Sequence, residues 1–172
     1  DSLYYGLSGA HQTNPFGLSA GHNSQEVIFI GASTTGLANN TVVEIHGGSL
    51  DNSTSMLNIN NATIDYLQFA NVKFDGGGTA QYCVDQSLGR NTHNMAFINC
   101  RFTNAFSDGY NTGNTPGYTN FVHCRFDNNG GAGISAAHSN FSMYHKCLFD
   151  NNITDGARIG GHARVSNCVF AH

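Results

Sequence analysis

The apolar positions of this chain repeat every 21 to 28 residues over residues 69–172. Each repeat has an inward residue, a middle residue and a phenylalanine, found at Val72–Phe74, Cys100–Phe102, Cys124–Phe126, Cys147–Phe149 and Cys168–Phe170. A further apolar side chain precedes each unit by three positions, namely Phe69, Phe97, Phe121, Tyr144 and Val165. Because side chains of a strand alternate between its two faces, the first and third residues of each unit are predicted to point inward.

Identical inward residues at this spacing predict coils stacked about 4.8 Å apart, with each phenylalanine lying on that of the preceding coil. A third inward column is predicted from Tyr82, Tyr110, Ile134 and Ile159. The sequence therefore predicts an all-β fold, a single-stranded parallel β-helix (solenoid) with about 5–7 coils over residues 26–172. Residues 1–25 show no repeat and are expected to form an N-terminal extension or cap, whereas the C-terminal coil is expected to be uncapped beyond Phe170.

The composition favours a turn-rich fold over disorder. Asn, Gly, Ser and Thr number 22, 21, 14 and 13, and these residues are typical of turns and form helices poorly. The chain also has 40% hydrophobic residues, with 12 Phe and 7 Tyr, which a disordered chain rarely carries. Only 10% of residues are charged and the net charge is −4, so we expect no nucleic-acid partner. No run of about 18 apolar residues predicts a membrane span.

The strings Asn99-Cys100-Arg101-Phe102-Thr103-Asn104 and Asp108-Gly109-Tyr110 resemble the repeat of the pectate-lyase-like superfamily of right-handed parallel β-helix proteins. The resemblance covers roughly residues 42–172 and implies a right-handed solenoid. It does not specify a function, because this scaffold hosts lyases, hydrolases, epimerases, phage tailspikes, adhesins and structural solenoids. Function must therefore be argued from individual residues.

Turn residues follow each repeat phenylalanine at the same position in every coil. Stacking of the coils is expected to join Asn104, Asn128 and Asn151 into a hydrogen-bonded ladder. Asp127 and Asp150 share a phase in adjacent coils, where two carboxylates repel each other unless a cation lies between them. Ca²⁺ is one candidate, but the basic residues of this outward face favour ion pairs; these are Lys73, Arg101 and Arg125. No cofactor is otherwise predicted.

The sequence offers one set of candidate catalytic residues for polysaccharide cleavage. Asp108 and Asp155 each begin an Asp-Gly pair two coils apart, so about 10 Å would separate them, which is long even for an inverting pair of carboxylates. The segment Asp155–His162 is mildly similar to the Asn-Thr-Asp, Gly-His-Gly and Arg-Ile-Lys elements of polygalacturonases, and this similarity singles out Arg158 and His162. It lacks an Asp-Asp pair and Gly-His-Gly, and Gly160 replaces the lysine. Asp-Gly also marks an ordinary turn.

Carbohydrate binding without cleavage is predicted from aromatic residues outside the inward columns, which are Phe106, Tyr118 and Phe141. Asn-x-Ser/Thr triplets, the acceptors of N-glycosylation in a secreted protein, begin at Asn39, Asn52, Asn61, Asn140 and Asn152. Five cysteines leave at least one unpaired, and four of them share one inward position. We expect these four to pack as small hydrophobic residues, with disulfides between coils or a metal site as alternatives.

Low charge and an open apolar end favour an extracellular or cell-surface structural solenoid over an enzyme. Such a protein would assemble end to end, or form a segment of a longer fibre, adhesin or surface protein, with self-association or adjoining β-helix segments as its partners. The alternatives are a polysaccharide-active enzyme, pectate-lyase-like or polygalacturonase-like, and a non-catalytic carbohydrate-binding module. For either alternative the partner would be a polysaccharide.

Overall fold

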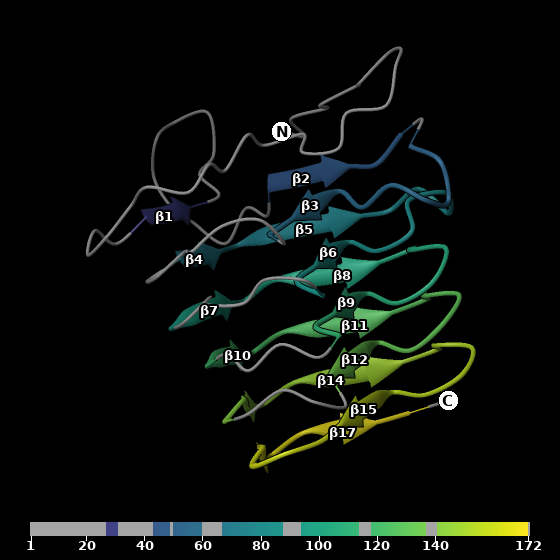
Figure 1. The fold of residues 1–172 in the computed structure, drawn as a ribbon. Helices are drawn as coiled ribbons and strands as arrows, with labels where there is room; N and C mark the ends of the chain where they lie inside the picture. The colour runs from purple at the N-terminus through teal and green to yellow at the C-terminus, as the bar shows by residue number, and fades with distance from the viewer. Residues whose placement is uncertain are drawn as a thin grey trace.

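Three parallel β-sheets form the fold in a computed structural model, which describes residues 27–30, 43–48, 50–59, 67–87, 94–113, 118–136 and 141–171 (Figure 1). Sheet A contains β1 (Val27–Ile30), β4 (Leu67–Ala70), β7 (Met95–Ile98), β10 (Thr119–Val122), β13 (Met143–His145) and β16 (Arg164–Ser166). Sheet B contains β2 (Val43–His46), β5 (Val72–Asp75), β8 (Arg101–Thr103), β11 (Arg125–Asp127), β14 (Leu148–Asp150) and β17 (Val169–Phe170). Sheet C contains β3 (Leu57–Asn58), β6 (Val84–Asp85), β9 (Tyr110–Asn111), β12 (Ile134–Ala136) and β15 (Ala157–Ile159).

The chain visits the three sheets in turn, so that each strand pairs with the strand one coil away. About four turns are complete, β4–β6, β7–β9, β10–β12 and β13–β15, with strands of further coils on either side. No helix occurs in the ranges described above. The predicted all-β parallel solenoid is confirmed, while the count of 5–7 coils stays a prediction. The proposed cap at residues 1–25 lies outside the described residues.

Two predicted inward columns are present in register. In sheet A, Phe69, Phe97, Phe121, Tyr144 and Val165 lie opposite one another. In sheet B, Phe74, Phe102, Phe126, Phe149 and Phe170 do the same, with successive ring centroids 4.7–5.3 Å apart. The rings of neighbouring coils are nearly parallel, and the two columns meet edge to face inside the solenoid. Apolar burial along these columns is the main stabilising contribution to the fold.

The third predicted column is wrong at two of its four positions. Tyr110 and Ile134 are paired as predicted, but Val84 stands in place of Tyr82, and Ala157 stands in place of Ile159. The turn after Phe74 contains three consecutive glycines, of which Gly77 and Gly78 have φ values of 63° and 76°. This turn is two residues longer than its counterparts, so it delays the inward residue from position 82 to 84.

The coils turn at three corners, where ten of the described residues other than glycine adopt positive φ. The corner between sheets A and B has Asn71, Asn99, His123, Lys146 and Asn167. The corner after sheet B has Asn104, Asn128 and Asn151, and the corner before sheet A has Asn94 and Phe141. Asparagine tolerates the left-handed conformation better than most residues, which explains part of its abundance.

The predicted amide ladder is displaced by one residue. The side-chain amide of Asn104 donates to the Asp75 carboxylate, and that of Asn128 donates to the Asp127 carboxylate. The ladder instead forms between the buried Asn129 and Asn152. The Asn129 amide nitrogen donates to Asn152 Oδ1 at 2.9 Å, and its oxygen accepts from the Ala105 N–H at 3.1 Å. The prediction of a ladder at Asn104, Asn128 and Asn151 is therefore wrong, because the left-handed backbone at those positions directs the chain around the corner.

Candidate functional site

A ladder of ion pairs covers the outer face of sheet B. Arg101 binds the carboxylate of Asp127 through two nitrogens, at 2.8 and 2.5 Å. Arg125 lies between Asp127 and Asp150, 3.3 and 3.1 Å from their carboxylate oxygens. The Asp127 side chain is fully buried beneath these guanidinium groups. Both carboxylates that sequence analysis considered for Ca²⁺ are thus already neutralised by arginine.

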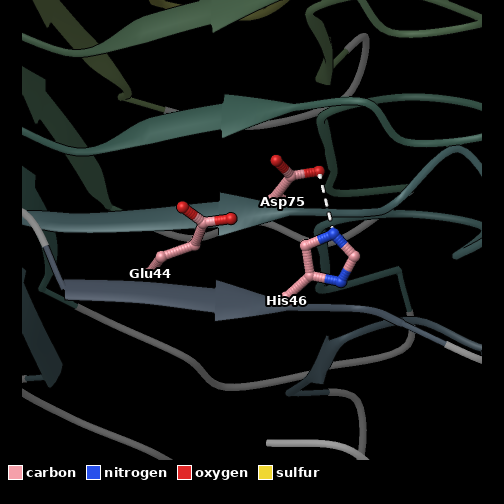
Figure 2. Close-up of side chains that lie close together, drawn as sticks. All are labelled: Glu44, His46 and Asp75. Atoms are coloured by element: carbon pink, nitrogen blue, oxygen red, sulfur yellow. Dashed lines mark ion pairs between the residues drawn. The ribbon is translucent and has the colours of Figure 1, made fainter. Parts of the chain in front are cut away.

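Glu44, His46 and Asp75 form a second cluster at the β2 end of the same face (Figure 2). Their potential ligand atoms lie within 4.8 Å of one another, and His46 Nε2 is 4.0 Å from Asp75 Oδ1. His46 Nδ1 accepts the Gly48 N–H at 2.8 Å, which leaves Nε2 directed at Asp75. No sequence motif marks this cluster, because its members come from two coils separated by about 30 residues.

The ammonium group of Lys73 compensates the charge of this cluster. Its nitrogen lies 3.3 Å from Glu44 Oε2 and 2.7 Å from Asp75 Oδ2. Burial acts to lower the pKa of Lys73, but the hydrogen bonds and charges of Asp75 and Glu44 outweigh it and raise that pKa. Burial likewise opposes the charge of Asp75, yet Lys73, Asn104 and the Gly77 N–H hold its pKa below the ordinary value. A metal ion would have to displace Lys73.

An open groove of about 910 Å³ runs across several coils at the corner between sheets B and C. Its lining includes the His46–Asp75 pair. It also includes the amide side chains of Asn104, Asn128 and Asn151 and the exposed apolar side chains of Phe106 and Ile153. Phe106, one of the aromatic residues predicted to bind carbohydrate, is 54% exposed here. The groove could not be predicted from sequence, since its walls come from coils distant along the chain.

The other two predicted carbohydrate-binding residues lie at a different corner. Tyr118 and Phe141 stack with ring centroids 5.3 Å apart, and His162 stacks on Phe141 at 5.1 Å. Both aromatic side chains are about half exposed. Phe141 has φ of 58°, an uncommon conformation for an aromatic residue. The structure therefore unites Tyr118 with Phe141 and His162, and separates all three from Phe106 at the groove.

The candidate catalytic residues divide between different environments. Asp108 is buried, and its carboxylate accepts the Ala132 N–H at 2.7 Å, as expected of a residue that fixes a turn. Asp155 and Arg158 are both exposed and pair with each other at 2.5 Å. His162 belongs to the aromatic stack. Burial raises the pKa of Asp108, while the Ala132 hydrogen bond and the Arg158 charge partly oppose that change.

Asp108→Asn is expected to stabilise the fold at neutral pH, because it removes a charge that burial penalises while keeping an oxygen for the Ala132 N–H. A carboxyl whose pKa is raised by folding contributes stability below its unfolded pKa and loses it as pH rises through the folded pKa. The stability of the variant should therefore match that of the wild type near about pH 3 and exceed it increasingly as pH rises above about 4. Urea unfolding over this range tests the sign. A variant less stable at neutral pH would contradict it.

The glycosylation triplets differ in accessibility. Asn52 lies in an exposed turn, whereas Asn152 is buried and donates its amide to the Phe126 carbonyl at 3.0 Å. A glycan on Asn152 would require this hydrogen bond to be broken. Asn39, Asn61 and Asn140 lie outside the described residues.

The five cysteines are free thiols, and four form the column that sequence analysis placed inside the solenoid. Cys100, Cys124 and Cys147 are buried, and Cys168 is partly exposed at the last described coil. Each of these four donates to a carbonyl of the preceding coil, at 3.2–3.5 Å. The fifth, Cys83, is fully buried elsewhere in the core, where burial raises its pKa to about 12. Buried thiols of this kind pack as small hydrophobic groups.

A thiol-specific reagent should modify Cys168 faster than the other four cysteines in the native protein. The reason is access, since Cys168 alone is partly exposed and thiol reactions need contact with solvent. Mass spectrometry after brief treatment with iodoacetamide, followed by peptide mapping, measures the order of labelling. Equal rates of labelling for Cys124 and Cys168 in the folded protein would contradict the burial of Cys124 inside the solenoid.

Searches against family models, curated proteins and solved structures found no match for this chain. Within the described ranges, no helix is long and apolar enough to cross a membrane. The arrangement of the strands makes this chain a parallel β-solenoid. Because one fold can host many functions, the evidence for function comes from the surface residues of this chain.

Proposed function

We propose that this chain is a structural solenoid whose coil formed by β15, β16 and β17 stacks on a further coil, either of a second copy in end-to-end assembly or of an adjoining segment of a longer fibre, adhesin or surface protein. The observation that carries the proposal is the exposure of repeat residues on this coil. Phe170 is 55% exposed, whereas the four earlier phenylalanines of its column are fully buried. Val165 is also 46% exposed, although the ring it follows in sheet A, Tyr144, is fully buried.

The backbone of this coil supports the same proposal. Among the described strands, β15, β16 and β17 each pair on one side only. An unpaired parallel edge offers hydrogen-bonding groups to another strand, and natural proteins usually cover such edges. A second copy with the same cross-section would supply both the backbone partners and an apolar layer for Phe170. The contact would be heterologous and would extend into a filament unless it closed.

The proposal includes three finer features. The winding is right-handed, as crossovers between parallel strands of one sheet almost always are. The chain belongs among pectate-lyase-like solenoids, which its Asn-Cys-Arg-Phe-Thr-Asn repeat resembles. Its location is extracellular or at a cell surface, where a filament with few charged groups and an exposed glycosylation triplet at Asn52 would function.

Phe170→Glu tests the assembly. A carboxylate in the stacking layer cannot be buried without a partner, so we expect the variant to remain monomeric where the wild type self-associates. Sedimentation velocity over a range of protein concentrations measures this. Phe106→Glu is the matched control, because Phe106 is a similarly exposed phenylalanine in the turn between β8 and β9, well before the end coil, and its replacement should leave assembly unchanged. A wild type that stays monomeric throughout would contradict end-to-end assembly.

A second candidate function, carbohydrate binding, is favoured by the groove between sheets B and C. Its amides and the exposed Phe106 ring are groups that hydrogen-bond and stack on sugars. Affinity electrophoresis with a panel of polysaccharides should show retardation that Phe106→Ala removes and Tyr118→Ala, at the other corner, does not. Release of reducing or unsaturated sugars that is lost in Asp155→Ala would instead favour an enzyme.

A further inference from the structure

Phe106, Gly130 and Ile153 occupy the same place in three successive coils, as the fourth residue after each repeat phenylalanine. All three line the groove at the corner between sheets B and C. The Gly130 N–H donates to the Ala105 carbonyl at 2.9 Å, and this bond joins the first coil to the second. The Ile153 N–H donates to the Asn129 carbonyl at 3.0 Å and joins the second coil to the third in the same register. Bare backbone therefore separates two apolar side chains along the groove.

The fold excludes any side chain from the middle coil at this place. A Cβ atom on Gly130 would collide with the carbonyl oxygen of Phe106. The two walls, Phe106 and Ile153, and the glycine between them all belong to described coils. The result is a gap in the groove with an apolar side chain at each end and backbone as its floor.

The spacing of the coils gives this gap the width of one ring. Two steps of about 4.8 Å place Phe106 and Ile153 about 10 Å apart along the solenoid axis. A van der Waals contact of about 4 Å on each side uses about 8 Å of this separation. One ring can therefore contact both side chains at once, whereas two rings cannot enter together.

Amide side chains lie beside the gap. Asn128 and Asn151 stand two residues before Gly130 and Ile153, are exposed, and line the same groove. The Asn128 amide nitrogen donates to Asp127 Oδ2 at 2.8 Å, and its oxygen accepts no hydrogen bond from the described residues. Amides that both donate and accept are suited to hydroxyl groups, which do the same.

The charges of the groove select against acidic ligands. Its described lining contains no lysine or arginine, and its carboxylate belongs to Asp75. This carboxylate is already bound by Lys73 at 2.7 Å and by the Asn104 amide at 3.0 Å. A uronate or a phosphate would therefore lose hydration in the groove without gaining a cation. A neutral ring with an apolar face and hydroxyl groups at its edge, such as a pyranose, avoids this cost.

We propose that the groove binds uncharged polysaccharides, with one pyranose ring held between Phe106 and Ile153. The C–H face of the sugar packs on Phe106 and its opposite side contacts Ile153. Its hydroxyl groups bond to the amides of Asn128 and Asn151. The site rests on the carbohydrate binding proposed for this groove, to which it adds the class of sugar and the position of the ring.

Affinity electrophoresis of the whole chain tests the class of sugar. Two gels contain uncharged polymers, galactomannan and hydroxyethylcellulose, and two contain uronates, polygalacturonate and alginate. We expect retardation in at least one uncharged gel and none in the uronate gels. Retardation by uronates that Phe106→Ala removes would overturn the uncharged class while carbohydrate binding at the groove stands. The absence of retardation in all four gels would overturn both.

Replacement of each wall tests the position of the ring. Phe106→Ala should weaken the affinity for the retarding polymer at least about tenfold, and Ile153→Ala at least about threefold, because each removes apolar contact with the sugar. Ile98→Ala is the matched control for Ile153→Ala, since Ile98 is an exposed isoleucine in sheet A and its loss should leave the affinity unchanged. Equal affinity of Ile153→Ala and the wild type would overturn the placement between two walls.

Replacement of an amide tests the polar contact. Asn128 has φ of 55°, so Asn128→Gly removes the amide and keeps the backbone conformation. It should weaken the affinity about two- to tenfold, the effect of one hydrogen bond. Asn167→Gly, at an exposed asparagine with φ of 54° at the corner between sheets A and B, is its control. Equal affinity of the two variants would overturn the role of the amide.

Discussion

Phe126→Ala is expected to lower the free energy of unfolding by about 3–5 kcal/mol, the cost typical of removing a fully buried phenylalanine. The Phe126 ring stacks on Phe102 at 4.7 Å and on Phe149 at 5.1 Å, and it meets Phe121 edge to face at 5.4 Å. Its loss would leave a cavity between two coils, where the neighbouring rings are fixed by their own strands. Guanidinium unfolding followed by circular dichroism measures the change.

Phe106→Ala provides the control for this replacement, since the same side chain is removed from a half-exposed position. Its effect should stay within about 0.5 kcal/mol, as is usual for surface positions. Equal losses from Phe126 and Phe106 would contradict the assignment of the repeat phenylalanines to the interior.

Asn129→Ala is expected to destabilise the fold by about 2–4 kcal/mol, because it breaks the buried amide ladder. Asn129 Oδ1 accepts the Ala105 N–H, and its amide nitrogen donates to the Phe102 carbonyl at 3.3 Å and to Asn152 Oδ1. Alanine would leave the buried Ala105 N–H without this acceptor. Thermal unfolding by calorimetry measures the loss.

The adjacent corner supplies a matched comparison. Asn151 is exposed and has φ of 50°, a conformation that glycine adopts without cost, so Asn151→Gly should change stability by less than about 0.5 kcal/mol. If Asn151→Gly were the more damaging replacement, the ladder would run through the residues originally predicted from sequence.

The parallel solenoid could be predicted because its information is local and repeated. Each Cys-x-Phe or Val-x-Phe unit combines strand alternation with a fixed place in the coil, so stacking the units determines which residues share a column. The strand register could be predicted wherever the turn length is constant. The prediction of inward residues is wrong at Tyr82, where the glycine turn adds two residues, and at Ile159, where Ala157 keeps the eight-residue spacing from the phenylalanine.

The candidate sites were less accessible to sequence reasoning. The groove and the Glu44–His46–Asp75 cluster depend on side chains from different coils and on how each corner directs them. The buried ladder had a usable signal, since Asn128-Asn129 and Asn151-Asn152 repeat as pairs while Asn104 is followed by alanine. The second asparagine of each pair is the one that turns inward.

Most of the charged side chains that the structure describes form ion pairs with one another. Among the described residues, the basic side chains that form ion pairs with aspartate or glutamate are Lys73, Arg101, Arg125 and Arg158. A catalytic site needs charged groups directed at a substrate, whereas these groups connect neighbouring coils or turns. This arrangement accords with the proposed structural role and with contact surfaces that consist of apolar and amide groups.

Electron cryomicroscopy of the wild type at increasing protein concentration tests the central proposal most directly. End-to-end assembly should give particles that lengthen along the solenoid axis by whole chains, with layers about 4.8 Å apart continuing across each junction between chains. Phe170 should then lie beneath a strand of the next copy. Particles that keep the length of one chain at every concentration would contradict the proposal.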